Sequence, residues 1–91
     1  MEFTREDIAK VMEETKRRMD FDIKEGVLPR NARYIKAELA TRMQGVYGTI
    51  MAVVPNKNWC DIVWWLDDEL EELYKHYGLG KLFFDDGTRN I

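Results

Sequence analysis

The sequence of 91 residues has few of the groups that catalytic and disulfide-bonded proteins use. It holds one cysteine, Cys60, and one histidine, His76, so a disulfide framework within the chain is excluded. On one continuous helix these two residues would lie roughly 24 Å apart at about 1.5 Å per residue. Since that distance is too long for a nucleophile and its base, we expect no enzymatic activity, no metal and no cofactor.

Long apolar runs are also missing. The longest spans residues 49–54, whereas a membrane-spanning helix needs about 20 apolar residues. The amino-terminal segment MEFTRED is charged, unlike the apolar centre of a secretory signal. Together with the single cysteine, these features predict a chain without membrane contact and with a cytoplasmic location.

Apolar residues are nevertheless frequent enough, at 45% of the chain, to build the core of one small domain over residues 1–91. A capping box of Thr4 and Asp7 predicts a helix over about residues 5–25, which ends before Gly26. A second helix is predicted over 59–77, because apolar residues recur there at helical spacings of four and three. These residues are Trp59, Val63, Leu66, Leu70, Leu73 and Tyr77.

A further helix over about 32–54 can be interpreted in two ways. The apolar residues from Ile35 to Val53 keep one helical phase, which favours a continuous helix. Gly45 and Gly48 could instead break it near residues 44–48, which would give two helices and a turn. In the continuous helix, the glycines belong to a second stripe of small residues that could let another helix approach closely, namely Ala37, Thr41, Gly45, Gly48 and Ala52.

In the carboxyl-terminal segment, the apolar residues no longer follow a helical spacing. Leu82, Phe83 and Phe84 are followed by the Asp86-Gly87 pair, which is typical of a β-hairpin with a type I′ turn, here over residues 82–91. Such a hairpin needs support from the helices or from a partner. The predicted fold class is therefore mainly α, with three helices and a short terminal hairpin.

Residues 23–50 resemble the start of GntR-type winged-helix regulators. The matching residues, in the order of that family, are Ile23, Gly26, Leu28-Pro29, Arg33, Glu38-Leu39-Ala40, Gly45-Val46 and Gly48-Thr49-Ile50. The resemblance implies a helix-turn-helix that binds DNA, with the hairpin as its wing. The residues that would contact DNA are Arg33, Lys36, Arg42, Tyr47 and Thr49. Direct base readout needs arginine, lysine, asparagine or glutamine, and Tyr47, Gly48, Met51 and Ala52 supply none, so DNA binding is our alternative hypothesis.

Charge is unevenly distributed along the chain, although its net value is only -3. Residues 27–57 carry five basic and one acidic side chain, and residues 58–91 carry eight acidic and three basic side chains. Either the basic and acidic faces complement each other, or one of them meets a partner of opposite sign. Residues 61–78 are also similar to a helix of MazG-type nucleotide pyrophosphatases, which is our third hypothesis.

Our first hypothesis is a small non-enzymatic protein-binding module, an accessory or inhibitor protein of a phage or other mobile element. Spaced carboxylates on a helix can imitate the phosphates of nucleic acid, and exposed aromatic residues can anchor a protein interface. We expect a protein partner and a homodimer. The candidate partner-binding residues are Trp64, Trp65, Asp67, Asp68, Glu71, Glu72, Phe83 and Phe84.

Overall fold

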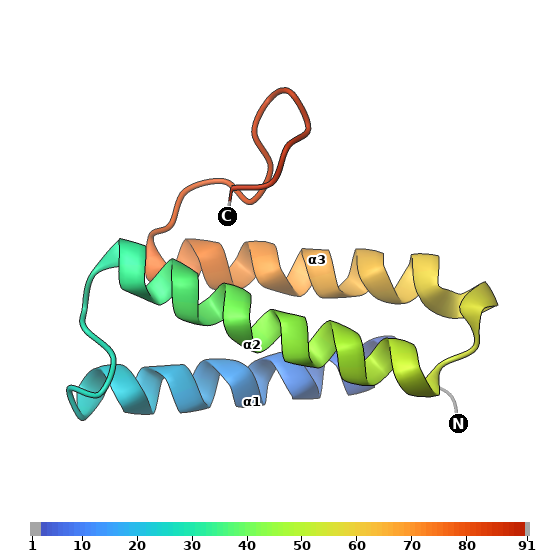
Figure 1. Ribbon diagram of the computed structural model, residues 1–91, viewed down its shortest axis with the longest axis horizontal. Helices are drawn as coiled ribbons and strands as arrows, with labels where there is room; N and C mark the ends of the chain where they lie inside the picture. Colours follow the sequence, from blue (N-terminus) through green and yellow to red (C-terminus); the bar gives the residue numbers. More distant parts are fainter. Residues whose placement is uncertain (1–2, 91) are drawn as a thin grey trace.

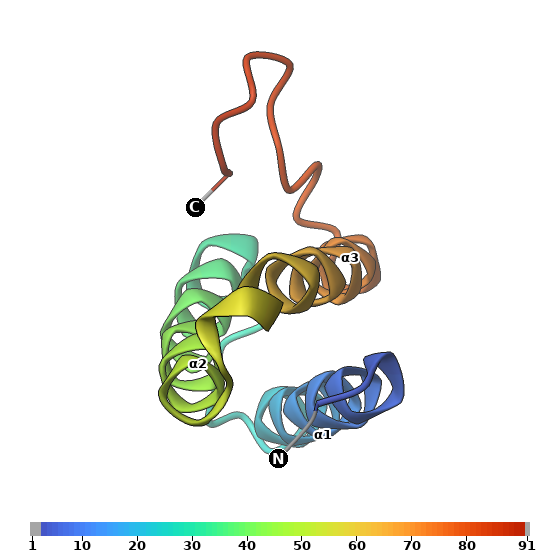
Figure 2. The same cartoon turned by 90° about the vertical axis from the view of Figure 1, so that its right-hand side faces the viewer.

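The computed structural model describes residues 3–90 and shows three helices side by side, each antiparallel to the one before it (Figure 1). They are α1 (Arg5–Lys24), α2 (Ala32–Val53) and α3 (Trp59–Tyr77), and a short 3-10 turn, η1 (Asn56–Asn58), precedes α3. The prediction of a mainly helical chain with three helices is confirmed. Viewed along their axes, the helices form a triangle (Figure 2).

The ends of α1 and α3 follow from local chemistry. Thr4 Oγ1 accepts a hydrogen bond from the Asp7 amide at 3.1 Å, and Asp7 Oδ2 accepts one from the Thr4 amide at 3.0 Å. This pair is the predicted capping box. Gly78, with φ of +66°, ends α3 in the left-handed region, where a residue without a side chain is least strained.

Helix α2 continues through residues 44–48 without a turn. Ile35, Leu39, Met43 and Ile50 are all buried, so one apolar face holds the whole helix against the core. A break at the glycines would rotate Ile50 out of phase with Leu39. The continuous helix was therefore the correct interpretation of this segment.

One core joins the three helices. Its largest fully buried side chains are Ile8, Met12, Met19, Leu39, Ile62, Leu66 and Leu82. In α3 the buried side is centred on Ile62, Leu66 and Leu70, and the predicted seam residue Val63 lies at its border, half-buried. At the α2–α3 connection, the indole N–H of Trp59 donates to the Val54 carbonyl oxygen at 2.9 Å, which holds the turn closed.

The predicted β-hairpin over 82–91 is not found. Residues 3–90 contain no β-strand and only an isolated antiparallel bridge between Phe83 and Arg89, and Ile91 lies outside the described residues. The turn is not type I′, because that type needs positive φ at two residues and only Gly87 has it here, at +87°. The Thr88 amide donates to Asp86 Oδ1 at 2.9 Å, so it is not available for pairing between strands.

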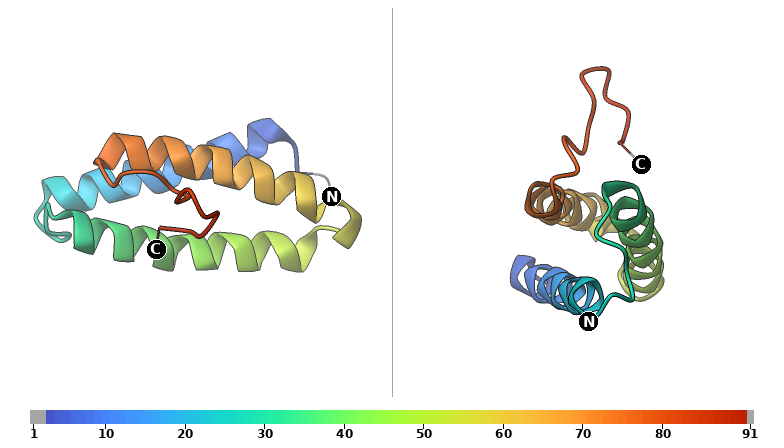
Figure 3. Two further views of the ribbon diagram at one scale, coloured as in Figure 1. Left: turned by 90° about the horizontal axis from the view of Figure 1, so that it is seen from above. Right: turned by 90° about the vertical axis from the view of Figure 1, so that its left-hand side faces the viewer.

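The segment 79–90, which we call the tail, lies over α2 and α3 when the molecule is seen from above (Figure 3). Leu79 and Leu82 are buried at its base, and its tip stands away from the helices (Figure 1). The tail is therefore a loop anchored at its base.

Candidate functional site

The side of α3 that points away from the core carries most of its charge. Trp64 is 67% exposed there, the most exposed of the tryptophans. Helical spacing places four exposed carboxylates around it. We call this surface the acidic face, and it consists of Asp61, Trp64, Asp68, Glu71 and Glu72.

Two of the four carboxylates on the acidic face have ion-pair partners. Arg5 Nη1 lies 3.2 Å from Asp68 Oδ2, and Lys75 Nζ lies 3.4 Å from Glu72 Oε1. All four of these side chains are largely exposed, so the two ion pairs contribute little to stability. Asp61 was not among the predicted residues, although its position three residues before Trp64 is a signal that helical spacing could have provided.

The structure separates the eight predicted partner-binding residues. Trp64, Asp68, Glu71 and Glu72 lie on the acidic face, and the tail residue Phe84 is 51% exposed. Trp65 and Phe83 are instead half-buried against the core, and the Asp67 side chain is only 16% exposed. Five of the eight predicted residues are therefore exposed to solvent, and three are half-buried.

Asp67 points toward α2 and the tail rather than toward solvent. Its Oδ1 accepts hydrogen bonds from the Tyr47 hydroxyl at 2.8 Å and from Arg89 Nη2 at 2.7 Å. The Arg89 guanidinium lies over the Phe83 ring at 5.4 Å, within the range of a cation–π contact. We call Tyr47, Asp67 and Arg89 the tail junction.

Asn90 adds a second attachment. Its carbonyl oxygen accepts from the Tyr74 hydroxyl at 2.6 Å, and its Oδ1 accepts from Lys36 Nζ at 2.8 Å. No local pattern in the sequence could have identified these contacts, because they join residues that are far apart in the chain. They show that the tail is built onto the helices by specific polar contacts.

The predicted DNA-contacting residues are not gathered on one surface. Arg42 is bonded to Asp22 at 2.8 Å and to Glu38 at 2.9 Å, while Lys36 and Tyr47 hold the tail. Arg33 and Thr49 are exposed, but they lie roughly 24 Å apart along α2 at about 1.5 Å per residue. Three of the five side chains therefore have partners within the molecule.

Because the tail junction contains Tyr47, the free energy of unfolding should depend on pH in the alkaline range. Burial raises the pKa of Tyr47 to about 12 from 10.0, and its hydrogen bond to Asp67 acts in the same direction. The folded chain then binds a proton that the unfolded chain has lost, so the free energy of unfolding falls as pH rises from about 10 to about 12.

Urea denaturation between pH 8 and pH 12 measures this effect. We expect Tyr47→Phe to have a shallower fall than the unaltered chain. The fall should not vanish, because burial also raises the pKa of Tyr74 and of Tyr77. Identical slopes for the two proteins would show that Tyr47 ionises as freely in the folded state as in the unfolded state.

Two further properties of the described residues concern metal binding and membrane crossing. Residues 3–90 bring together no group of three histidine, cysteine or acidic side chains that could hold a metal ion. None of their helices has both the length and the apolar character needed to cross a bilayer.

Comparisons of the chain with protein-family models, with curated proteins and with solved structures gave no match. The surface of the molecule is therefore the basis for inferring its function, and the acidic face is a distinctive part of that surface.

Proposed function

We propose that this chain is a non-enzymatic protein-binding module that uses its acidic face to bind a basic surface on another protein. The observation that carries the proposal is Trp64, a large aromatic side chain that is 67% exposed on the same side of α3 as four exposed carboxylates. Tryptophan is among the residues that contribute most to protein interfaces when a charged rim surrounds it. The carboxylates would steer a basic partner toward the face, and Trp64 would anchor it.

The spacing of the charges suggests the kind of partner. Asp61, Asp68 and Glu72 follow one side of α3, as phosphates follow one strand of a nucleic acid. A groove that binds nucleic acid largely through phosphate contacts also attracts other ordered anions. We therefore propose an inhibitor or accessory protein, of the type that phages and other mobile elements encode, that occupies such a groove.

Affinity capture with matched variants tests this proposal. The chain would be immobilised and exposed to a bacterial lysate, and the retained proteins would be identified by mass spectrometry. We expect Trp64→Ala to lower retention of a nucleic-acid-binding protein at least about tenfold, as expected for an interface anchor. The combined reversal Asp68→Lys, Glu71→Lys and Glu72→Lys should do the same, and added duplex DNA should release the partner.

Control variants separate the acidic face from other surfaces. Tyr34→Ala removes another exposed aromatic side chain, and the pair Glu13→Lys and Glu25→Lys reverses exposed acidic residues on α1 and just after it. These changes should leave retention unaltered. Equal losses in the control and test variants would overturn the proposal.

The purified chain and duplex DNA also allow a test of the DNA-binding alternative. A gel shift of duplex DNA at low salt by the chain alone, weakened by Arg33→Ala, would support a winged-helix-like regulator. We place this alternative second because Lys36, Arg42 and Tyr47 are bonded within the molecule.

A further inference from the structure

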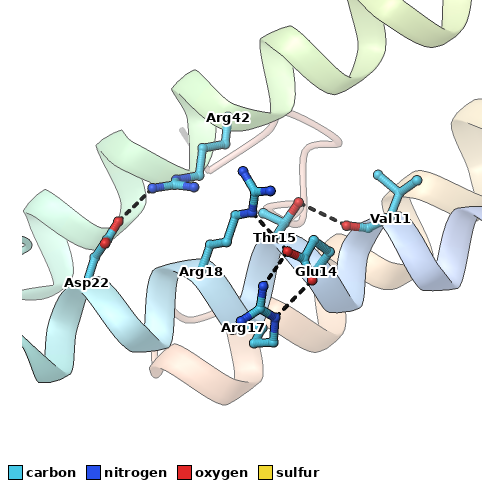
Figure 4. A network of polar contacts seen from close by, with 7 residues as sticks. All are labelled: Val11, Glu14, Thr15, Arg17, Arg18, Asp22 and Arg42. Atoms are coloured by element: carbon cyan, nitrogen blue, oxygen red, sulfur yellow. Dashed lines mark hydrogen bonds and ion pairs between the residues drawn. The ribbon is translucent and has the colours of Figure 1, made fainter.

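A groove separates α1 from α2 on the side of the molecule away from the tail junction. It has a volume of about 660 Å³, and its apolar lining includes Val11, Val46 and Ile50. Figure 4 shows one end of it, where Arg42 reaches from α2 to Asp22 on α1. In a single copy of the chain, apolar side chains next to the core therefore line a groove that is open to solvent.

Beyond Arg42, the wall that α2 contributes to this groove carries no charge. Gly45 and Thr49 line the groove, and Gly48, Ala52 and Val53 extend the same exposed surface. From residue 44 to residue 54 the sequence has no charged side chain, in a chain that is 34% charged. A solvent-facing helix surface of this length normally carries several charges.

Most of the charges at the rim are already matched within the molecule. Glu14 Oε1 lies 2.9 Å from Arg18 Nε and 2.6 Å from Arg17 Nη2, as Figure 4 shows. Arg42 is paired with Asp22 and Glu38. Lys10 also lines the groove, and its flexible stem allows its ammonium group to stay in water. A highly charged occupant would thus meet little opposite charge in the groove and would lose hydration there.

We propose that the groove and the uncharged surface of α2 form the interface between two copies of this chain. The uncharged surface of α2 beyond Arg42 is best covered by another uncharged surface, and of the three helices only α2 offers one. The outer surface of α1 carries Lys10, Glu13 and Arg17, and α3 carries the acidic face. Two copies of α2 that pack on each other about a two-fold axis match uncharged surface with uncharged surface.

The geometry of α2 allows this close packing. A Cβ atom added at Gly45 or at Gly48 would meet nothing within 4 Å in the single chain, so neither glycine is required by packing inside one copy. In the proposed dimer the missing side chains let the two α2 backbones approach, and residues beside them enter the facing groove. This interface leaves the acidic face of each copy exposed.

Sedimentation equilibrium over a range of concentrations tests the dimer. We expect the unaltered chain to reach twice its mass of 10.8 kDa. Gly48→Glu and Thr49→Glu each place like charges across the two-fold axis, so each should raise the dissociation constant by about a hundredfold. The control Val27→Glu introduces the same charge at a position that is 74% exposed in the α1–α2 loop, and it should remain dimeric.

A second variant at Gly48 shows whether a loss of the dimer results from misfolding of the single chain. Gly48→Ala should raise the melting temperature of dilute protein, because alanine favours a helix, while it weakens the dimer by separating the backbones. The proposal is overturned if the unaltered chain stays at 10.8 kDa at millimolar concentration, or if Gly48→Glu remains as dimeric as Val27→Glu. A monomer that binds a fatty acid or another protein in the groove would also overturn it.

Discussion

Replacing Leu66 with alanine should lower the free energy of unfolding by about 3 kcal/mol, the usual cost of a leucine-to-alanine change in a close-packed core. Leu66 is 0% exposed and belongs to the core that joins all three helices. Because a domain of this size has a total stability of roughly 5–13 kcal/mol, the loss should be evident as a lower urea midpoint. The slope of the unfolding transition should stay the same.

Trp64, two residues earlier on the same helix, is the matched control. Since its ring is largely exposed, Trp64→Ala should change stability by no more than about 0.5 kcal/mol. The contrast between the two variants would show that Trp64 is not needed for the fold. A cost for Trp64→Ala close to that of Leu66→Ala would mean that the indole is part of the core, and the proposed binding function would lose its main support.

Replacing Asp67 with alanine has the second largest expected effect on stability, a loss of about 2 kcal/mol, because it leaves Arg89 and the Tyr47 hydroxyl without their shared acceptor. The tail should then open more often. Hydrogen exchange measures this directly, since the Phe84 and Asn90 amides are bonded to Thr88 and Leu82 within the tail. Both amides should exchange faster in Asp67→Ala.

Asp68 supplies the control for this experiment. It is the neighbouring aspartate, but its side chain is 63% exposed and pairs only with the exposed Arg5. Asp68→Ala should therefore leave both stability and tail exchange nearly unchanged. If the two aspartates gave equal effects, the tail junction would not hold the tail.

The helices could be predicted because their signals are local. Thr4 with Asp7, Gly26 and Gly78 mark ends that the structure places within a residue or two of the prediction. The continuity of α2 followed from the unbroken phase of its apolar residues, which outweighed the two glycines. Such patterns depend on neighbours along the chain and need no knowledge of the rest of the fold.

The tail and the exact site could not be predicted in this way. Whether Asp67 faces a partner or the tail depends on where Arg89 lies, and nothing near either residue shows that they meet. The Asp86-Gly87 pair resembled a two-residue hairpin turn, but Asp86 bonds to Thr88 instead. Contacts between distant residues decide these details, whereas composition and spacing describe only the separate parts.

The attachment of the tail also bears on the order of folding. The junction residues Asp67 and Arg89 are 22 positions apart, whereas Arg5 of α1 and Asp68 of α3 are 63 positions apart. Contacts between segments close in the chain form first, because closing a short loop costs less entropy. We therefore expect the tail to settle on α3 at least as early as α1 does. The buried side chains Leu79 and Leu82 would then help to assemble the core rather than only cover it.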